Sequence, residues 1–256
     1  MVLSTEEMRD FLDEKARLYN NPQFIELDPI QIPHMYTAKE DVEIAGFLSA
    51  TISWGNRKAI VKGARKMMDL MGNAPYDFIM SCGDAQRDRL GDYVYRTFNG
   101  IDFTFFIEAL RFIYQDRGGL EDLFTRHQTG DSLQAAIHQL KQVFFSIPHP
   151  ERTRKHLPDP MTGSAAKRMN MFLRWMVRND KCGVDFGIWK KISPSILSCP
   201  LDLHTGNVAR KLALIDRKQN DSKAVSQLDQ SLRVLDPVDP VKYDFALFGL
   251  GIFEKF

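Results

Sequence analysis

Apolar residues recur every three to four positions along almost the whole chain, and almost no segment alternates apolar and polar residues as a strand would. This spacing puts apolar side chains on one face of an α-helix, so the pattern predicts an all-α protein. With 256 residues, of which 44% are hydrophobic and 26% charged, the chain can bury a core without disulfides or a structural metal. The composition excludes a disordered or collagen-like chain.

Helix caps and breakers divide the chain further. The predicted helices, with the residues expected to cap them, are 4–18 (Ser4, with Glu7 as a capping box), 42–53 (Asp41), 57–72 (Asn56), 75–82, 102–115 (Asp102), 131–145, 164–178 (Ser164), 203–215 (Asp202), 221–235 and 240–250 (Asp239). The segment 146–163 contains four prolines and several basic residues. We expect it to separate two helical lobes within a single compact unit that covers residues 1–256.

The chain carries no pattern typical of export or membrane insertion. Its first residues are acidic, and the longest uncharged apolar run, Phe245–Phe253, is far shorter than the roughly 20 residues that span a bilayer. Cys82, Cys182 and Cys199 are widely spaced and form no CxxC motif, which is typical of reduced thiols. We therefore expect a cytoplasmic protein with no membrane partner, of unknown oligomeric state.

Charge is unevenly distributed along a chain whose formal net charge is only +1. Residues 1–50 carry ten acidic and four basic side chains, whereas residues 151–223 carry fifteen basic and seven acidic ones. This asymmetry indicates a surface in the second half that faces a polyanion, the alternative being ordinary solvated helix faces.

The predicted helix 164–178 has an apolar face and a basic face. The basic face carries Lys167, Asn170, Arg174 and Arg178. With Ser164 as N-cap, Lys167 occupies the third helical position, where a cation opposes the helix dipole. The same field favours the neutral amine, which is the form that attacks carbon. A tolerated surface lysine is the alternative.

Asp202 directly precedes the apolar periodicity of residues 203–215. As an N-cap, its carboxylate would accept a hydrogen bond from the amide of His204 or Thr205, which contributes about 1 kcal/mol and is a sufficient structural reason for it. A carboxylate held at a helix start can also deprotonate an amine or stabilise a developing cation.

Four stretches resemble the helix-hairpin-helix DNA glycosylase superfamily. They are the aspartate segment Leu201–Thr205 with the following Ala209–Leu212, the lysine helix Lys167–Phe172, the closing stretch Tyr243–Gly251, and the helix, turn and helix of Ala45–Ile60 that is similar to the part that wedges into DNA. The lysine helix is most similar to that of archaeal 8-oxoguanine glycosylases. The resemblance implies a two-lobed glycosylase-like fold in which Lys167 forms a Schiff base and Asp202 is the assisting carboxylate.

The chain departs from the superfamily at the hairpin, where residues 160–167 read PMTGSAAK with one glycine, so the helix-hairpin-helix is degenerate. No iron–sulfur cluster is expected, because three scattered cysteines cannot supply four ligands, and no other cofactor or metal is implied. The phrases KRMNMFLRWMVR and DPVKYDFALFGLG also resemble an uncharacterised bacterial family over most of the chain.

The implied partner is double-stranded DNA with a damaged base, which must be flipped out of the helix at a cost of a few kcal/mol. Basic side chains would hold its phosphates. The expected DNA-binding residues are Arg152, Arg154, Lys155, Arg168, Arg174, Arg178, Trp54 and Asn56. Trp54 or Trp189 could stack on the flipped base, and a position in the core is the alternative for each.

Three other functions remain open. The degenerate hairpin fits a non-catalytic nucleic-acid-binding protein on the same scaffold. A metal-dependent hydrolase would use His156, Asp159, Asp202 and His204, although these lack the paired-histidine spacing of a helical metal site. A purely structural protein is the third.

Overall fold

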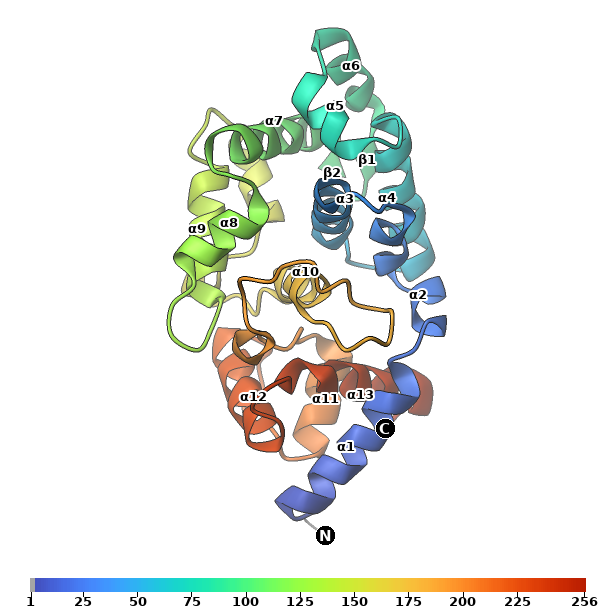
Figure 1. Cartoon of the computed structure of the whole chain (residues 1–256), viewed down its shortest axis with the longest axis vertical. Coiled ribbons are helices and arrows are strands. Elements are labelled where there is room, and N and C mark those ends of the chain that lie inside the picture. Colours follow the sequence, from blue (N-terminus) through green and yellow to red (C-terminus); the bar gives the residue numbers. More distant parts are fainter. Residues whose placement is uncertain (1–2) are drawn as a thin grey trace. The chain divides into compact units, whose positions relative to one another are not determined.

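The structure is a computed structural model that describes residues 3–256, and nearly all of its regular structure is helical (Figure 1). The strands in this part of the chain are one antiparallel pair, β1 (Val94–Tyr95) and β2 (Phe98–Asn99), with Val94 opposite Asn99. None of the described helices combines the length and the apolar character needed to cross a bilayer. The prediction of an all-α protein is confirmed.

The chain forms two compact units. Unit 1 comprises residues 1–24, 128–135 and 159–256, and unit 2 comprises residues 25–127 and 136–158. The chain passes from unit 2 into the last part of unit 1 between Pro158 and Asp159, inside the proline-rich segment singled out above. Two of the other boundaries between the units fall inside helices, namely α2 (Gln23–Leu27) and α9 (Gln134–Phe144).

Unit 1 is a helical bundle made from both ends of the chain. Its elements are α1 (Thr5–Tyr19), η5 (Pro160–Thr162), α10 (Lys167–Val177), η6 (Pro194–Ile196), α11 (Leu203–Lys211), α12 (Ser222–Leu235), η7 (Pro240–Lys242), α13 (Tyr243–Gly249) and the π-helical turn η8 (Leu250–Glu254). α1 packs along α13 (Figure 1). Its apolar face, with Met8, Leu12 and Ala16, joins α11, α12 and α13 in one core.

Unit 2 packs around a dense aromatic core. Its elements are η1 (Pro29–Gln31), η2 (Pro33–Met35), α3 (Lys39–Thr51), α4 (Arg57–Leu70), α5 (Pro75–Ser81), α6 (Asp84–Asp88), η3 (Arg89–Asp92), β1, β2, α7 (Gly100–Asp116), α8 (Leu120–His127), most of α9, and η4 (Glu151–His156). Phe106 lies at the centre, with ring centroids 4.7 Å from Phe144 and 5.2 Å from Phe98. The largely apolar α3 is buried along most of its length.

Several predicted caps are present as expected. Ser4 and Glu7 form a reciprocal capping box at the start of α1, with N–O distances of 2.8 and 3.2 Å. The Asn56 side chain accepts a hydrogen bond from Ala59 at the start of α4. Both caps depend on residues three positions apart, so local sequence is enough to predict them.

Three acidic residues do not cap the helices assigned to them. α3 begins earlier than predicted, and the Asp41 carboxylate accepts a hydrogen bond from the Tyr76 amide (2.9 Å). Asn99 caps α7, and Asp102 is the third residue of its capping box. Asp239 makes no side-chain cap bond. Asp41 and Asp239 are instead bound by residues distant in sequence, and at α7 the neighbouring Asn99 takes the cap position.

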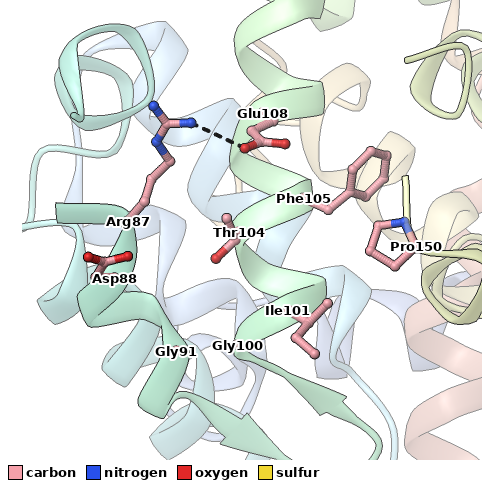
Figure 2. Close-up of a pocket in the computed structure, with 9 residues that line it drawn as sticks. All are labelled: Arg87, Asp88, Gly91, Gly100, Ile101, Thr104, Phe105, Glu108 and Pro150. Carbon is pink, nitrogen blue, oxygen red and sulfur yellow. Dashed lines mark hydrogen bonds and ion pairs between the residues drawn. The ribbon is translucent and has the colours of Figure 1, made fainter. Parts of the chain in front are cut away.

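The start of α7 passes so close to η3 that a side chain cannot fit at Gly100. A Cβ there would lie 2.4 Å from the carbonyl oxygen of Gly91, while a Cβ at Gly91 would meet nothing within 4 Å (Figure 2). We expect Gly100→Ala to lower the free energy of unfolding in urea by about 1–3 kcal/mol, because rigid backbone must move. Gly91→Ala is the control and should leave it within about 0.5 kcal/mol of wild type. Equal stability of the two variants would contradict this packing.

Candidate functional site

The turn before α10 determines the position of Lys167. Gly163 adopts the left-handed conformation (φ 96°), and so does Ala166 (φ 47°), which residues other than glycine rarely do. The prediction that Ser164 caps the helix is wrong, because its hydroxyl accepts a hydrogen bond from the Ala166 amide (3.1 Å) within the turn. Lys167 is therefore the first residue of α10 rather than the third.

Asp202 is the N-cap of α11, as predicted. Its Oδ1 accepts a hydrogen bond from the Thr205 amide (3.0 Å), and its own backbone carbonyl accepts one from Asn220 (2.8 Å). The carboxylate is thus held by its helix, and the backbone that carries it is held by the loop before α12.

The structure brings Lys167 and Asp202 together. Lys167 Nζ lies 3.1 Å from Asp202 Oδ2, and the two side chains are 33% and 22% exposed, so a ligand can reach both. Burial pushes the pKa of Asp202 upward, but the Lys167 ammonium and the Thr205 amide outweigh burial and hold that pKa below its usual value. Asp202 is therefore ionised at neutral pH.

This pair has the parts of an activated amine nucleophile. An ammonium must lose a proton before it can attack carbon, and Asp202 is an ionised acceptor within hydrogen-bonding distance of it. The same carboxylate can stabilise positive charge that develops on a bound substrate. Each residue lies at a helix start, so its backbone is fixed.

The prediction of an exposed basic face on α10 is wrong for Arg174 and Arg178, which are only 3% and 2% exposed. Arg174 forms ion pairs with Asp185 (3.2 Å) and Asp244, and Arg178 pairs with Asp185 and Asp239 (both 3.0 Å). The periodicity separates polar from apolar faces correctly, but here acidic partners cover the polar face. These arginines cannot hold DNA phosphates.

Two buried carboxyl groups anchor the segment that leads to Asp202. The Cys199 amide donates to Asp229 Oδ1 (2.9 Å), and the Cys199 thiol donates to Asp244 Oδ1 (3.8 Å). Asp229 lies on α12 and Asp244 on α13. Both helices therefore position the chain three residues before the catalytic candidate.

These two carboxyl groups have pKa values well above the usual value for an aspartate. Burial raises the pKa of Asp229 to about 7, against hydrogen bonds from Ser198 and Cys199 that lower it. Burial likewise raises the pKa of Asp244 to about 6, although the charge of Arg174 opposes it. Each therefore changes protonation close to neutral pH.

Neither carboxyl group was predicted as functional from the sequence, although the sequence contains a signal for both. Asp229 interrupts the apolar stripe formed by Val225, Leu228 and Leu232, and Asp244 is the only charged residue in 243–253. A lone carboxylate on an apolar face indicates a buried, partnered group.

The other basic residues predicted to bind DNA lie in varied surroundings. Arg152, in unit 2, is partly exposed and pairs with the fully buried Asp102 (2.8 Å). Arg154 is half-buried and Lys155 exposed on the same η4 turn. In unit 1, burial lowers the pKa of Arg168 to about 10.

The aromatic candidates differ from each other. Trp54 is half-buried in unit 2, where its ring stacks on His156 with centroids 6.1 Å apart, and exposed Asn56 follows it as the cap of α4. Trp189 is 1% exposed and packs edge-on against Phe172 in unit 1. Trp189 is therefore a core residue, and of the two tryptophans Trp54 is the accessible one.

A separate pocket of about 370 Å³ lies in unit 2, between η3 and the first turns of α7 (Figure 2). Arg87 and Glu108 form an ion pair across one end of it (3.2 Å), while Ile101, Phe105 and Pro150 supply an apolar wall. None of the residues predicted from the sequence lines it. Within residues 3–256, no three His, Cys, Asp or Glu side chains gather in a way that could hold a metal ion.

The burial of Arg174 leads to a stability prediction. Arg174→Ala leaves Asp185 without one partner and Asp244 without its guanidinium, so we expect the free energy of unfolding to fall by about 3–5 kcal/mol. Lys211→Ala, an exposed position on α11, is the control for loss of one cation. Urea denaturation followed by circular dichroism measures both. An Arg174→Ala protein as stable as the control would mean that the arginine is solvated.

A second prediction concerns pH. The pKa of Asp229 is raised on folding, so at intermediate pH the folded state retains a proton that the unfolded state releases. The contribution of this group to the free energy of unfolding of wild type is therefore lost as the pH rises from about 4 to about 7. Asp229→Asn keeps an acceptor for Cys199 but does not titrate. The stability of the variant relative to wild type should therefore increase between pH 5 and pH 8, by on the order of 2 kcal/mol. Exposed Asp10→Asn should show no such trend in the same urea titrations, and a flat difference for Asp229→Asn would refute the assignment.

Residues 28–253, nearly the whole chain, match one protein family, described as a protein of unknown function (DUF2400). No curated protein and no solved structure matches the chain. The matched residues include α10 with Lys167 and α11 with Asp202. The chain therefore belongs to the DUF2400 family.

Proposed function

We propose that this protein is a DNA base-excision repair glycosylase that acts on a damaged base flipped out of duplex DNA. The observation that carries the proposal is the contact between Lys167 Nζ and Asp202 Oδ2, at 3.1 Å, with both groups reachable from solvent. The resemblance of these two segments to the helix-hairpin-helix glycosylases supports the same chemistry, because it assigns the amine and the carboxylate independently of their distance.

In the proposed reaction, Asp202 accepts a proton from the Lys167 ammonium, and the free amine attacks the C1′ carbon of the sugar. The bond between C1′ and the base breaks, the base leaves with the electron pair and takes up a proton, and the sugar remains attached to Lys167. Opening of the sugar ring then gives an imine. The proton that the base takes up is the one that Asp202 accepted, so the carboxylate is ionised again as the base departs and stabilises the positive charge left on the sugar.

Two exposed apolar side chains lie close in sequence to the pair, which is compatible with a nucleic acid ligand. Leu203, next to Asp202, and Met161, in the turn before α10, are 65% and 57% exposed. Apolar side chains at such positions can contact sugars and bases. The buried Arg174, within α10, and Arg178, at its C-cap, are paired with carboxylates, so we assign them to positioning the helix and not to binding.

Borohydride trapping tests the proposal. With a panel of duplexes that each carry one oxidised, alkylated or deaminated base, wild type should form a covalent adduct with a duplex containing an oxidised purine. Lys167→Gln should abolish the adduct, since an amide cannot form an imine. Asp202→Asn keeps the helix cap but lacks the charge, so turnover should fall by roughly two orders of magnitude or more while binding persists.

The control is Lys223→Gln. Lys223 is an exposed lysine in the first turn of α12, so it also lies at a helix start, but within residues 3–256 its amine forms no ion pair with a carboxylate. The Lys223→Gln variant should form the covalent adduct as efficiently as wild type. Trapping that persists in Lys167→Gln would assign the nucleophile elsewhere. Binding without trapping or base release on every duplex would favour a non-catalytic nucleic-acid-binding protein, the function to which the single-glycine hairpin points.

A further inference from the structure

Exposed positive charge in unit 2 gathers on one face of α4. This helix carries five Lys or Arg residues and a single acidic one, Asp69. Its exposed cations are Lys58, Lys62, Arg65 and Lys66. Their spacing of four, three and one residues puts them on one side of the helix, while the opposite side, with Ile60, Ala64 and Met67, is buried.

Most of this charge is not neutralised within the protein. In the described part of the chain, Lys58, Lys62 and Arg65 make no ion pair. Lys66 donates to the backbone carbonyl of Asp92 (3.3 Å), which leaves its charge uncompensated. In contrast, two carboxylates balance the charge of Arg174 on α10.

A fifth cation extends the face at the start of α4. Arg96, exposed in the turn between β1 and β2, reaches back to Gly55, where a Cβ would lie 2.6 Å from its guanidinium carbon. Gly55 itself has a φ of 100°, which favours glycine. Trp54, half-buried, precedes this point. Lys58, Lys62, Arg65, Lys66 and Arg96 are called the α4 surface below.

The length of the α4 surface fits a polyanion with closely spaced charges. Eight residues of helix separate Lys58 from Lys66, which corresponds to about 12 Å. Each DNA strand carries one phosphate per roughly 3.4 Å of helix axis, and the phosphates also wind around that axis, so a straight row of cations of this length can contact more than one of them. A single small anion would engage only one or two of the side chains.

We propose that the α4 surface binds the phosphate backbone of duplex DNA. The choice of DNA over another polyanion rests on the proposed function, but the contact itself needs neither Lys167 nor a damaged base. Binding here releases counterions from the DNA, so its contribution appears as salt dependence of affinity and not as sequence preference.

The test measures binding of the full chain to an undamaged fluorescent duplex by anisotropy, at a series of KCl concentrations. The triple variant Lys58→Ala, Lys62→Ala and Arg65→Ala should flatten the log–log salt slope by about two to three, since each phosphate contact contributes about 0.9. Its Tm should stay unchanged, because the three positions are exposed and alanine favours helix.

The matched control removes three exposed cations from other elements of unit 2, through Arg89→Ala, Arg117→Ala and Arg126→Ala. It should keep the wild-type slope. An α4 triple variant with the wild-type slope, or a control with the same loss, overturns the inference. The inference is also overturned if wild type does not bind duplex DNA but sediments with vesicles of phosphatidylserine and phosphatidylcholine.

The two proposals fail separately. If the α4 triple variant has a flatter salt slope while no duplex gives a trapped adduct, the DNA-binding role of the α4 surface is supported and the glycosylase proposal is refuted. If trapping depends on Lys167 while the slope is unaffected by the α4 substitutions, the chemistry stands and DNA binds elsewhere.

Discussion

The guanidinium of Arg174 is the group on which the geometry of unit 1 depends. A charge buried to this extent costs several kcal/mol unless it is paired, so α10 is stable only where Asp185 and Asp244 can both reach it. The rings of Phe24 and Phe245 close over the same guanidinium at 5.9 and 4.3 Å. Because Lys167 begins this helix, the buried pairs also set where its amine points.

Two buried acids position Asp202, the carboxylate of the pair, and one of them, Asp244, is also a partner of Arg174. Asp229 holds the amide of Cys199 and Asp244 its thiol, and Asp202 follows three residues later. Asp244 thus contacts both the arginine of α10 and the segment before α11. The amine and the carboxylate are connected through the interior by one residue, so a change at Asp244 affects both sides of the pair.

Local sequence was sufficient for features that depend on near neighbours. Ser4, Asn56 and Asp202 cap helices because the amide that each binds lies three residues away. Periodicity also gave the fold class. It could not show that the polar face of α10 is buried, since the partners of Arg174 lie 11 and 70 residues away and a paired arginine has the same periodicity as a solvated one. Lys167 and Asp202, 35 residues apart, were linked only by resemblance.

The discontinuity of unit 1 sets the order in which the nascent chain can fold. α1 emerges from the ribosome early, but α13, which covers its apolar face, lies some 230 residues later. At 5–20 residues per second, α13 is synthesised roughly 10–50 s after α1, and all of unit 2 has been made by then. Unit 2 can therefore fold while synthesis continues. Lys167 and Asp202 gain their buried supports only after Asp244 has been synthesised, so this pair is among the last parts of the molecule to be assembled.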